Sequence, residues 1–206
     1  MDATSGLWGE SIALSSEGCF ASTLAVAPSG HAAVTWTQPG GSEAQLHVAH
    51  ASGASGRWSE EALPGAGSGA PVYPSVAVAD GAAMLVWRQG EAQDEVFASR
   101  RSSDGVWEPP VVLGRDAGPY SWPRVAVDGS SAAIATWHQG PDGSSRVVAA
   151  RYDPSSDDWS EPVLLDNGAA VAANPKIAIN EAGLAVVIWE EQESPGHSHL
   201  WASRWE

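Results

Sequence analysis

Aromatic, amide and charged side chains recur at fixed intervals in this sequence. Four tryptophans, at positions 36, 87, 137 and 189, each open a triplet Trp-x-Gln or Trp-x-Glu, and they are 51, 50 and 52 residues apart. A sugar stacks its apolar C–H face on an aromatic ring, while its hydroxyl groups need oriented amide or carboxylate partners. The predicted ligand-binding residues come from these triplets and from the residues just before the next repeat: Tyr73, Arg88, Gln89, Trp122, His138, Gln139 and Glu191.

Each of these residues has a structural alternative. A glutamine or glutamate that recurs in every copy is also expected if it tethers loop backbone. Trp122 is the strongest ligand candidate, because its counterparts in the other copies are not tryptophan. His197 and His199, with Glu191 or Glu193, are the weak metal candidates, with a polar hairpin as the alternative. No cofactor is expected.

Short apolar runs must position these residues. In the second copy the runs cover 75–79, 82–89, 95–100 and 106–113, are rich in valine, alanine and aromatic residues, and are bounded by Gly, Asp, Ser or Pro. Such runs are too short for typical helices and predict β-strands, which we designate a, b, c and d. A four-stranded antiparallel unit repeated about every 50 residues predicts an all-β fold, a four-bladed β-propeller.

Two patterns support the strand order. Pro109, Pro110 and Pro162 fall in run d, and proline is tolerated in an edge strand because it cannot donate to a ladder. Run a alternates large, small and large side chains, as in Val76-Ala77-Val78, so that one face of each inner strand is bulky and the other is alanine.

The phase of the repeat predicts how the ring closes. The sequence opens with a lone run d at 6–14 and ends with runs a, b and c, so pairing of the two ends would complete the last sheet. The predicted blades are about 20–65, 72–114, 121–166, and 173–206 with 6–14. A monomer is expected, and an eight-bladed ring of two chains or a piece of a larger propeller stays open.

The c–d hairpins "HASGASGRW", "RRSSDGVW" and "RYDPSSDDW" resemble the Asp-box, or BNR, hairpin of sialidase-like propellers. This resemblance implies that an Asp such as Asp104 caps the turn and that Trp107 packs between sheets. Sialidases would also need converging arginines, whereas Arg100, Arg151 and Arg204 share one strand position in different blades and are expected to point outward. Similarity to propeller lectins is weaker.

Composition excludes several partners. The formal net charge is −15, from 25 acidic and 10 basic residues, which disfavours nucleic acid and anionic membranes. No apolar run is long enough to span a bilayer, so no membrane insertion is expected. The start of the sequence has no signal-peptide pattern, so an extracellular or periplasmic location is expected only if a signal peptide has been removed. The single Cys19 makes no internal disulfide.

The sequence therefore predicts a non-catalytic, lectin-like binding module whose ligand, a glycan or another protein, lies on the face of the d–a and b–c loops. The first alternative is a glycan-processing hydrolase of sialidase-like type. A glycosidase with two carboxylates would instead draw on the clustered Glu190, Glu191 and Glu193. A protein-interaction scaffold, or an amplified repeat without an evolved ligand, is the remaining alternative.

Overall fold

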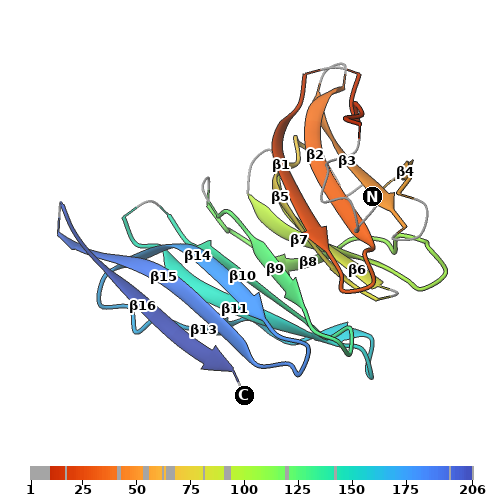
Figure 1. The fold of residues 1–206 in the computed structure, drawn as a ribbon. Helices are drawn as coiled ribbons and strands as arrows, with labels where there is room; N and C mark the ends of the chain where they lie inside the picture. The colour runs from red at the N-terminus through yellow and green to blue at the C-terminus, as the bar shows by residue number, and fades with distance from the viewer. Residues whose placement is uncertain are drawn as a thin grey trace.

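The computed structural model describes residues 10–205 except 17, 41–42, 53–55, 62, 64–67, 81, 91–93, 119–120, 142 and 195. These residues form four antiparallel sheets that follow one another in chain order (Figure 1). The predicted all-β, four-bladed β-propeller fold is thereby confirmed, and we number the sheets as blades 1 to 4. No helix in the described part of the chain is long and apolar enough to cross a membrane.

The strands of each blade run from the inner edge outward. Blade 1 holds β1 (Phe20–Val26), β2 (Ala32–Gly40), β3 (Glu43–Ala51) and β4 (Trp58–Glu61). Blade 2 holds β5 (Val72–Ala79), β6 (Ala82–Gln89), β7 (Glu95–Arg101) and β8 (Val111–Gly114). Blade 3 holds β9 (Arg124–Val127), β10 (Ala133–Gln139), β11 (Arg146–Asp153), β12 (Asp158–Trp159) and β13 (Val163–Leu164). Blade 4 holds β14 (Val171–Ile179), β15 (Ala185–Ser194) and β16 (His197–Trp205).

Proline sets the length of the outer strands. In blade 2 the ladder resumes only at Val111, directly after Pro109 and Pro110, and Trp107 contributes a single isolated bridge to Arg101. In blade 3 Pro162 lies between β12 and β13, which both pair with β11. A proline has no backbone N–H to donate, so the ladder breaks where the sequence places it.

The core lies between neighbouring blades. β6 and β10 are buried on both faces, because each lies in a blade with a neighbour on either side. One apolar cluster joins blades 1 and 2, another joins blades 2 and 3, and two smaller clusters join blades 3 and 4. β15 in blade 4 instead alternates along Ala185–Trp189 between buried residues and the exposed Val186 or half-buried Ile188, so the described residues cover only one face of this sheet.

The predicted ring closure is not found among the described residues. Of the segment 6–14, residues 6–9 lie outside the described part, and residues 10–14 form no strand. The described sheet of blade 4 ends at β16, and blades 1 and 4 stand at opposite ends of an open arc (Figure 1). The four-bladed fold is therefore confirmed, whereas the pairing of residues 6–14 with blade 4 stays a prediction, because residues 6–9 lie outside the described part of the chain.

Candidate functional site

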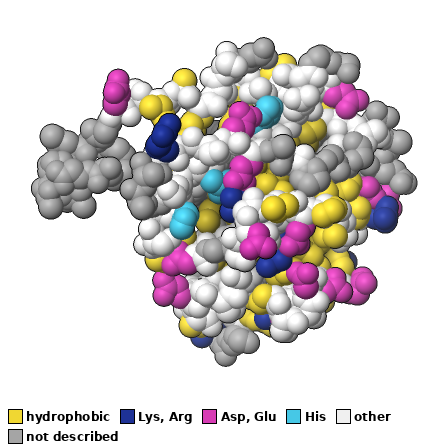
Figure 2. Space-filling view, turned by 90° about the vertical axis from the view of Figure 1, so that its right-hand side faces the viewer, with side chains coloured by type: hydrophobic (Ala, Val, Ile, Leu, Met, Phe, Trp, Pro, Cys, Tyr) yellow, Lys and Arg dark blue, Asp and Glu magenta, His cyan; other side chains and the backbone are white. Residues whose placement is uncertain are grey.

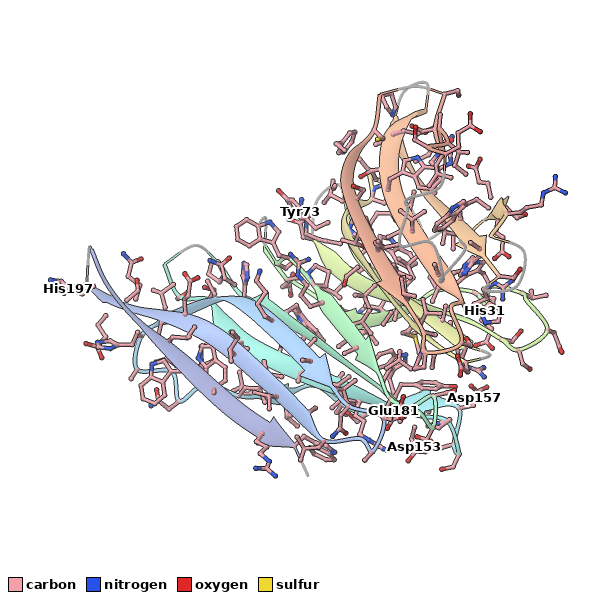
Figure 3. The ribbon with its side chains drawn as sticks, in the orientation of Figure 1. His31, Tyr73, Asp153, Asp157, Glu181 and His197 are labelled. Carbon is pink, nitrogen blue, oxygen red and sulfur yellow. The ribbon has the colours of Figure 1, made fainter. Side chains whose placement is uncertain are left out.

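An irregularity at the start of each inner strand positions the candidate site. Ala21, Tyr73, Trp122 and Asn174 occupy the same place in blades 1 to 4 and have positive φ angles of 52°, 53°, 21° and 55°. In blades 1, 2 and 4 the pairing register shifts at this point. A bulge re-aims a side chain, and strained backbone of this kind clusters at functional sites. Figure 3 shows Tyr73 at the upper edge of the blades, projecting toward blades 3 and 4.

In blades 2, 3 and 4 the residue that follows the triplet tryptophan contacts the bulge residue of its own blade. The Arg88 guanidinium lies 5.4 Å from the centre of the Tyr73 ring. The Trp122 and His138 rings meet edge to face at 5.9 Å. In blade 4, by contrast, the bulge residue Asn174 and the residue after the triplet tryptophan, Glu190, form a polar pair.

Two further contacts extend this arrangement along the arc. Asn174 Nδ2 donates to Glu190 Oε2 at 3.2 Å. Tyr73 also contacts Trp122 across the blade boundary, with ring centres 5.9 Å apart and nearly perpendicular. We call this set the inner row, which consists of the following residues: Tyr73, Arg88, Trp122, His138, Asn174 and Glu190.

Charges around the inner row are largely balanced. Arg88 forms an ion pair with Asp94 at 3.0 Å, at the blade 2 end. At the blade 4 end, burial and the nearby charge of Arg124 lower the pKa of Lys176, while Glu190 opposes that shift. Burial also lowers the pKa of Arg124. The row thus offers two aromatic rings and an exposed carboxylate, Glu190, without a concentrated positive charge.

The predicted site residues divide into two groups. Tyr73, Arg88, Trp122 and His138 are brought together in the inner row. The polar residues that end the triplets instead accept a hydrogen bond from the indole of their own triplet, as described next. Sequence reasoning left Asn174 and Glu190 out of the ligand-binding set, although their repeat positions match those of Trp122 and His138.

The triplets form the same bond in every blade. Each indole Nε1–H donates to the side chain two residues later, at 3.0 Å in Trp36–Gln38, 3.0 Å in Trp87–Gln89, 3.2 Å in Trp137–Gln139 and 2.8 Å in Trp189–Glu191. Gln89 also donates to the Gly69 carbonyl at 2.8 Å. Glu191 is buried beside Trp189. This geometry favours the structural tether over ligand contact for Gln89, Gln139 and Glu191.

The other candidates lie away from the inner row. His199 Nε2 is 3.5 Å from Glu193 on the outer hairpin of blade 4, where Figure 3 labels His197. Among the residues that the structure describes, no three His, Cys, Asp or Glu side chains gather as a metal site. The strand-c arginines do not converge: Arg100 pairs with Glu108 at 2.6 Å and Arg151 with Asp153 at 3.1 Å, in different blades.

The c–d hairpins depart from the Asp-box pattern. In blade 2 the turn is held by Gly105 N–H donating to Ser102 and by Ser102 N–H donating to Val106, and the exposed Asp104 makes no hydrogen bond to the described residues. In blade 3 the capping carboxylate is Asp153, which accepts from the Ser155 N–H and hydroxyl. These bonds and Arg151 lower the pKa of Asp153 to about 2. Trp107 does pack between blades 1 and 2, as the resemblance implies.

No protein-family model matches the sequence, and no curated protein matches it. Its fold is similar to that of solved β-propeller hydrolases. The GH93 α-L-arabinofuranosidase of Fusarium graminearum, in complex with arabinobiose, superposes with a TM-score of 0.60 at 12% identity, over 90% of this chain and 61% of that chain. An endo-arabinase from Bacteroides thetaiotaomicron gives 0.50 at 14% identity, over 86% and 72% of the two chains.

The NanB sialidase from Streptococcus pneumoniae gives a TM-score of 0.52 at 15% identity, over 88% of this chain and 28% of that one. The predicted sialidase-like propeller is thus confirmed at the level of the fold. The chain spans less than two thirds of the length of the GH93 structure. These neighbours contradict the predicted non-catalytic, lectin-like module and favour the glycan-processing hydrolase that the sequence left as the alternative.

Proposed function

We propose that this protein is a glycan-processing hydrolase of the β-propeller type and that the inner row binds the glycan. The observation that supports this proposal is the combination of two contacting aromatic rings, Tyr73 and Trp122, with an exposed carboxylate on a fold whose neighbours are glycoside hydrolases. Aromatic rings supply stacking area for sugar C–H groups, and His138 and Asn174 supply polar partners for hydroxyl groups.

A neutral sugar suits the inner row better than a sialic acid. The carboxylate of a sialic acid needs uncompensated cations, and Arg88 is already paired with Asp94 and packed over Tyr73. The overall charge of −15 adds to the repulsion of an anionic ligand. Arabinose-containing glycans, on which the GH93 enzyme and the endo-arabinase act by name, are therefore the substrates to test first.

Glu190 is the acid of this proposal. Most glycoside hydrolases place two carboxyl groups at the scissile bond, one of which donates or removes a proton. Glu190 is exposed and is oriented by the Asn174 amide at 3.2 Å, which leaves its second oxygen available to a substrate or a water molecule.

Hydrolysis of an aryl α-L-arabinofuranoside and of debranched arabinan by the full chain tests the proposal. Glu190→Gln keeps an acceptor for the Asn174 amide but removes the carboxyl group that would serve as acid or base, so kcat should fall by about 100-fold or more.

Glu193→Gln is the matched control, because Glu193 lies on the same strand, is exposed and contacts His199 instead of the inner row. Its kcat should stay unchanged. Absence of hydrolysis across a panel of neutral glycosides, or full activity in Glu190→Gln, would refute the assignment.

A further inference from the structure

Among the described residues, nothing covers one sheet face of each end blade. On blade 1, Leu24 is 64% exposed, whereas its counterparts Val76 and Val125 in blades 2 and 3 are 6% and 7% exposed. On blade 4, Leu200 is 70% exposed, whereas its counterpart Val147 in blade 3 is fully buried. Apolar side chains that neighbouring blades cover inside the arc are therefore open to solvent at both of its ends.

These two open faces are the two halves of one recurring contact. Inside the arc, the leading face of a blade, which carries Val125 in blade 3, packs against the trailing face of the preceding blade, which carries Val96 in blade 2. Blade 1 exposes a leading face and blade 4 exposes a trailing face. Each open face thus has the shape and chemistry of a surface that the chain buries three times.

A cavity of about 490 Å³ lies between blades 3 and 4, where β16 faces β12 and β13. The equivalent place between blades 1 and 2 is filled by an indole. Trp107 is 5% exposed there, donates its Nε1–H to Glu61 at 3.0 Å, and lies 5.8 Å from the His50 ring. It belongs to the apolar cluster that joins the two blades.

The blade 3 residues that line this cavity occupy the same positions as the blade 1 residues that surround Trp107. Four blade 1 residues surround Trp107, namely Ala33, Val48, His50 and Glu61. The first three are matched to blade 3 by counting from the triplet tryptophans, and Glu61 is matched through its ladder partner, because Glu61 pairs with Val48 as Val163 pairs with Ala149. All four of those counterparts line the cavity: Ile134, Ala149, Arg151 and Val163.

The blade 4 residues that line the cavity likewise occupy the same positions as the blade 2 residues that contact Trp107. In blade 2 Trp107 lies with Ala83 and Leu85 in the apolar cluster and forms a bridge with Arg101. The blade 4 counterparts of these three residues also line the cavity: Ala185, Val187 and Trp205. The cavity therefore has the residue positions of the Trp107 site, and it lies where an outer strand of blade 4 would place its tryptophan. We call this cavity the indole socket.

The sequence contains one outer-strand motif that belongs to no blade of the arc. "LWGESIAL" at 7–14 aligns with "VWEPPVVL" at 106–113 and "DWSEPVLL" at 158–165, with Trp8 in the place of Trp107 and Trp159. In the rest of the chain each outer strand leads into the inner strand of the following blade. Residues 6–14 lead into β1, so they belong to the blade that covers the leading face of blade 1.

Within one chain blade 4 cannot be that blade in this arrangement, because it stands at the other end of the arc (Figure 1). We propose that two copies of this chain associate head to tail, with residues 6–14 of one copy forming the outer strand of blade 4 in the other and Trp8 filling the socket. A head-to-tail contact repeated about a two-fold axis closes into a ring and covers both open faces. This inference is independent of the proposed hydrolase activity.

Solution mass tests the association. The full chain should sediment at micromolar concentration with twice the 21.3 kDa mass of one chain. Leu24→Asp, Leu200→Asp and Trp8→Ala should each shift the mass to that of a single chain, with the β-sheet circular dichroism retained. Val106→Asp is the control, because Val106 is 62% exposed on a turn outside both faces, and it should leave the mass doubled. A wild-type protein that sediments as one chain would overturn the proposal.

An engineered disulfide distinguishes a second copy from closure within one chain. Ile12 aligns with Val111, which pairs with Ala98, the counterpart of Ala202. Directly opposed residues of antiparallel strands lie within disulfide reach. Ile12→Cys with Ala202→Cys, in a Cys19→Ser background, should give a two-chain band on a non-reducing gel that disappears on reduction.

The control pair is Ile12→Cys with Val106→Cys, which should not cross-link. A disulfide confined to one chain would show that the ring closes on itself, and no disulfide at all would show that residues 6–14 do not pair with β16. Either result contradicts the two-copy assembly.

Discussion

Trp189 donates its indole N–H to Glu191 at 2.8 Å, and the same bond joins the triplet residues of the other three blades through a glutamine. Glu191 is thus the blade 4 version of an amide acceptor, buried beside its own tryptophan. This relationship separates it from its neighbour Glu190, which points to the opposite face of the same strand and into the inner row.

The tether predicts how Glu191 tolerates substitution. Glu191→Gln keeps the acceptor for Trp189, as in the other blades, and should change the free energy of unfolding by less than about 0.5 kcal/mol. Glu191→Ala leaves a buried indole N–H without its acceptor and should cost about 1–2 kcal/mol. Urea denaturation measures both, and equal losses for the two variants would argue against the tether.

Glu61 should contribute to stability between blades 1 and 2. It accepts hydrogen bonds from Arg101 at 2.7 and 2.5 Å and from Trp107 at 3.0 Å. Figure 2 shows histidine, acidic and basic side chains lying together at this end of the molecule. Glu61→Gln should therefore lower the free energy of unfolding at pH 7 by roughly 2 kcal/mol, while Glu60→Gln, on the more exposed side of β4, serves as the control.

The groups around Glu61 also predict how the free energy of unfolding depends on pH. Burial alone would raise the pKa of Glu61, but hydrogen bonds from Arg101 and Trp107 and the charges of His50 and Arg101 bring it below its usual range. Its contribution is present above the unfolded pKa of about 4.3 and is lost as the pH falls through the lower folded value. Glu61→Gln should flatten the stability curve in that acid range.

His50 should add a second change in the free energy of unfolding, at a higher pH than the change due to Glu61. Burial lowers its pKa more than the charge of Glu61 raises it, so the folded protein keeps His50 neutral where the unfolded chain is protonated. Stability should begin to fall as the pH drops below about 6.5. His50→Gln should remove this change in thermal melts recorded from pH 7 to pH 5, and an unchanged slope would contradict the assignment.

Among the described turn residues of the a–b and c–d connections in blades 2 and 3, we expect substitution of Asp128 to lower the free energy of unfolding most. It is buried and accepts from the Ser130 N–H at 2.8 Å, the Ser130 hydroxyl at 2.7 Å and the Ala132 N–H at 3.0 Å. Asp128→Ala should cost roughly 2 kcal/mol of unfolding free energy, because these donors lose their acceptor. Asp104→Ala, at the exposed turn position, should be within about 0.5 kcal/mol of the unmodified protein.

Trp122 should govern glycan affinity in the inner row. Trp122→Ala removes the ring that contacts both Tyr73 and His138, so KM for the preferred glycan should rise about 10-fold or more. Trp122→Phe keeps a stacking surface and should restore most of the affinity. Equal KM values for the unmodified protein and Trp122→Ala would exclude stacking at this position.

The repeat made most of the fold predictable. The predicted runs 82–89 and 95–100 match β6 and β7 to within one residue, because period and composition mark central strands clearly. The outer run 106–113 shrinks to β8, since Pro109 and Pro110 cannot join the ladder. The inner run 75–79 extends back to Val72, because a bulge restores pairing before the regular strand begins.

The candidate site was predictable only in part. Tyr73 and Trp122 were found because aromatic residues before the inner strand stand out from their counterparts. Their positive φ angles could not be predicted from the sequence, because no blade has glycine at the bulge position. Whether the two ends of the chain meet depends on the angle between sheets, which is a property of interblade packing and not of any local motif.

The bulge at the start of each inner strand also separates two requirements on the sequence. Ala21, Tyr73, Trp122 and Asn174 share one backbone shape but no side-chain type, and the buried tether beneath them is the same in each blade. Four positions can therefore be varied together in a small combinatorial library, provided that proline and the β-branched residues, which do not tolerate a positive φ, are left out. Selection from such a library would test whether a ligand preference can be changed at these four positions while the backbone is kept, as loop exchange does in an antibody.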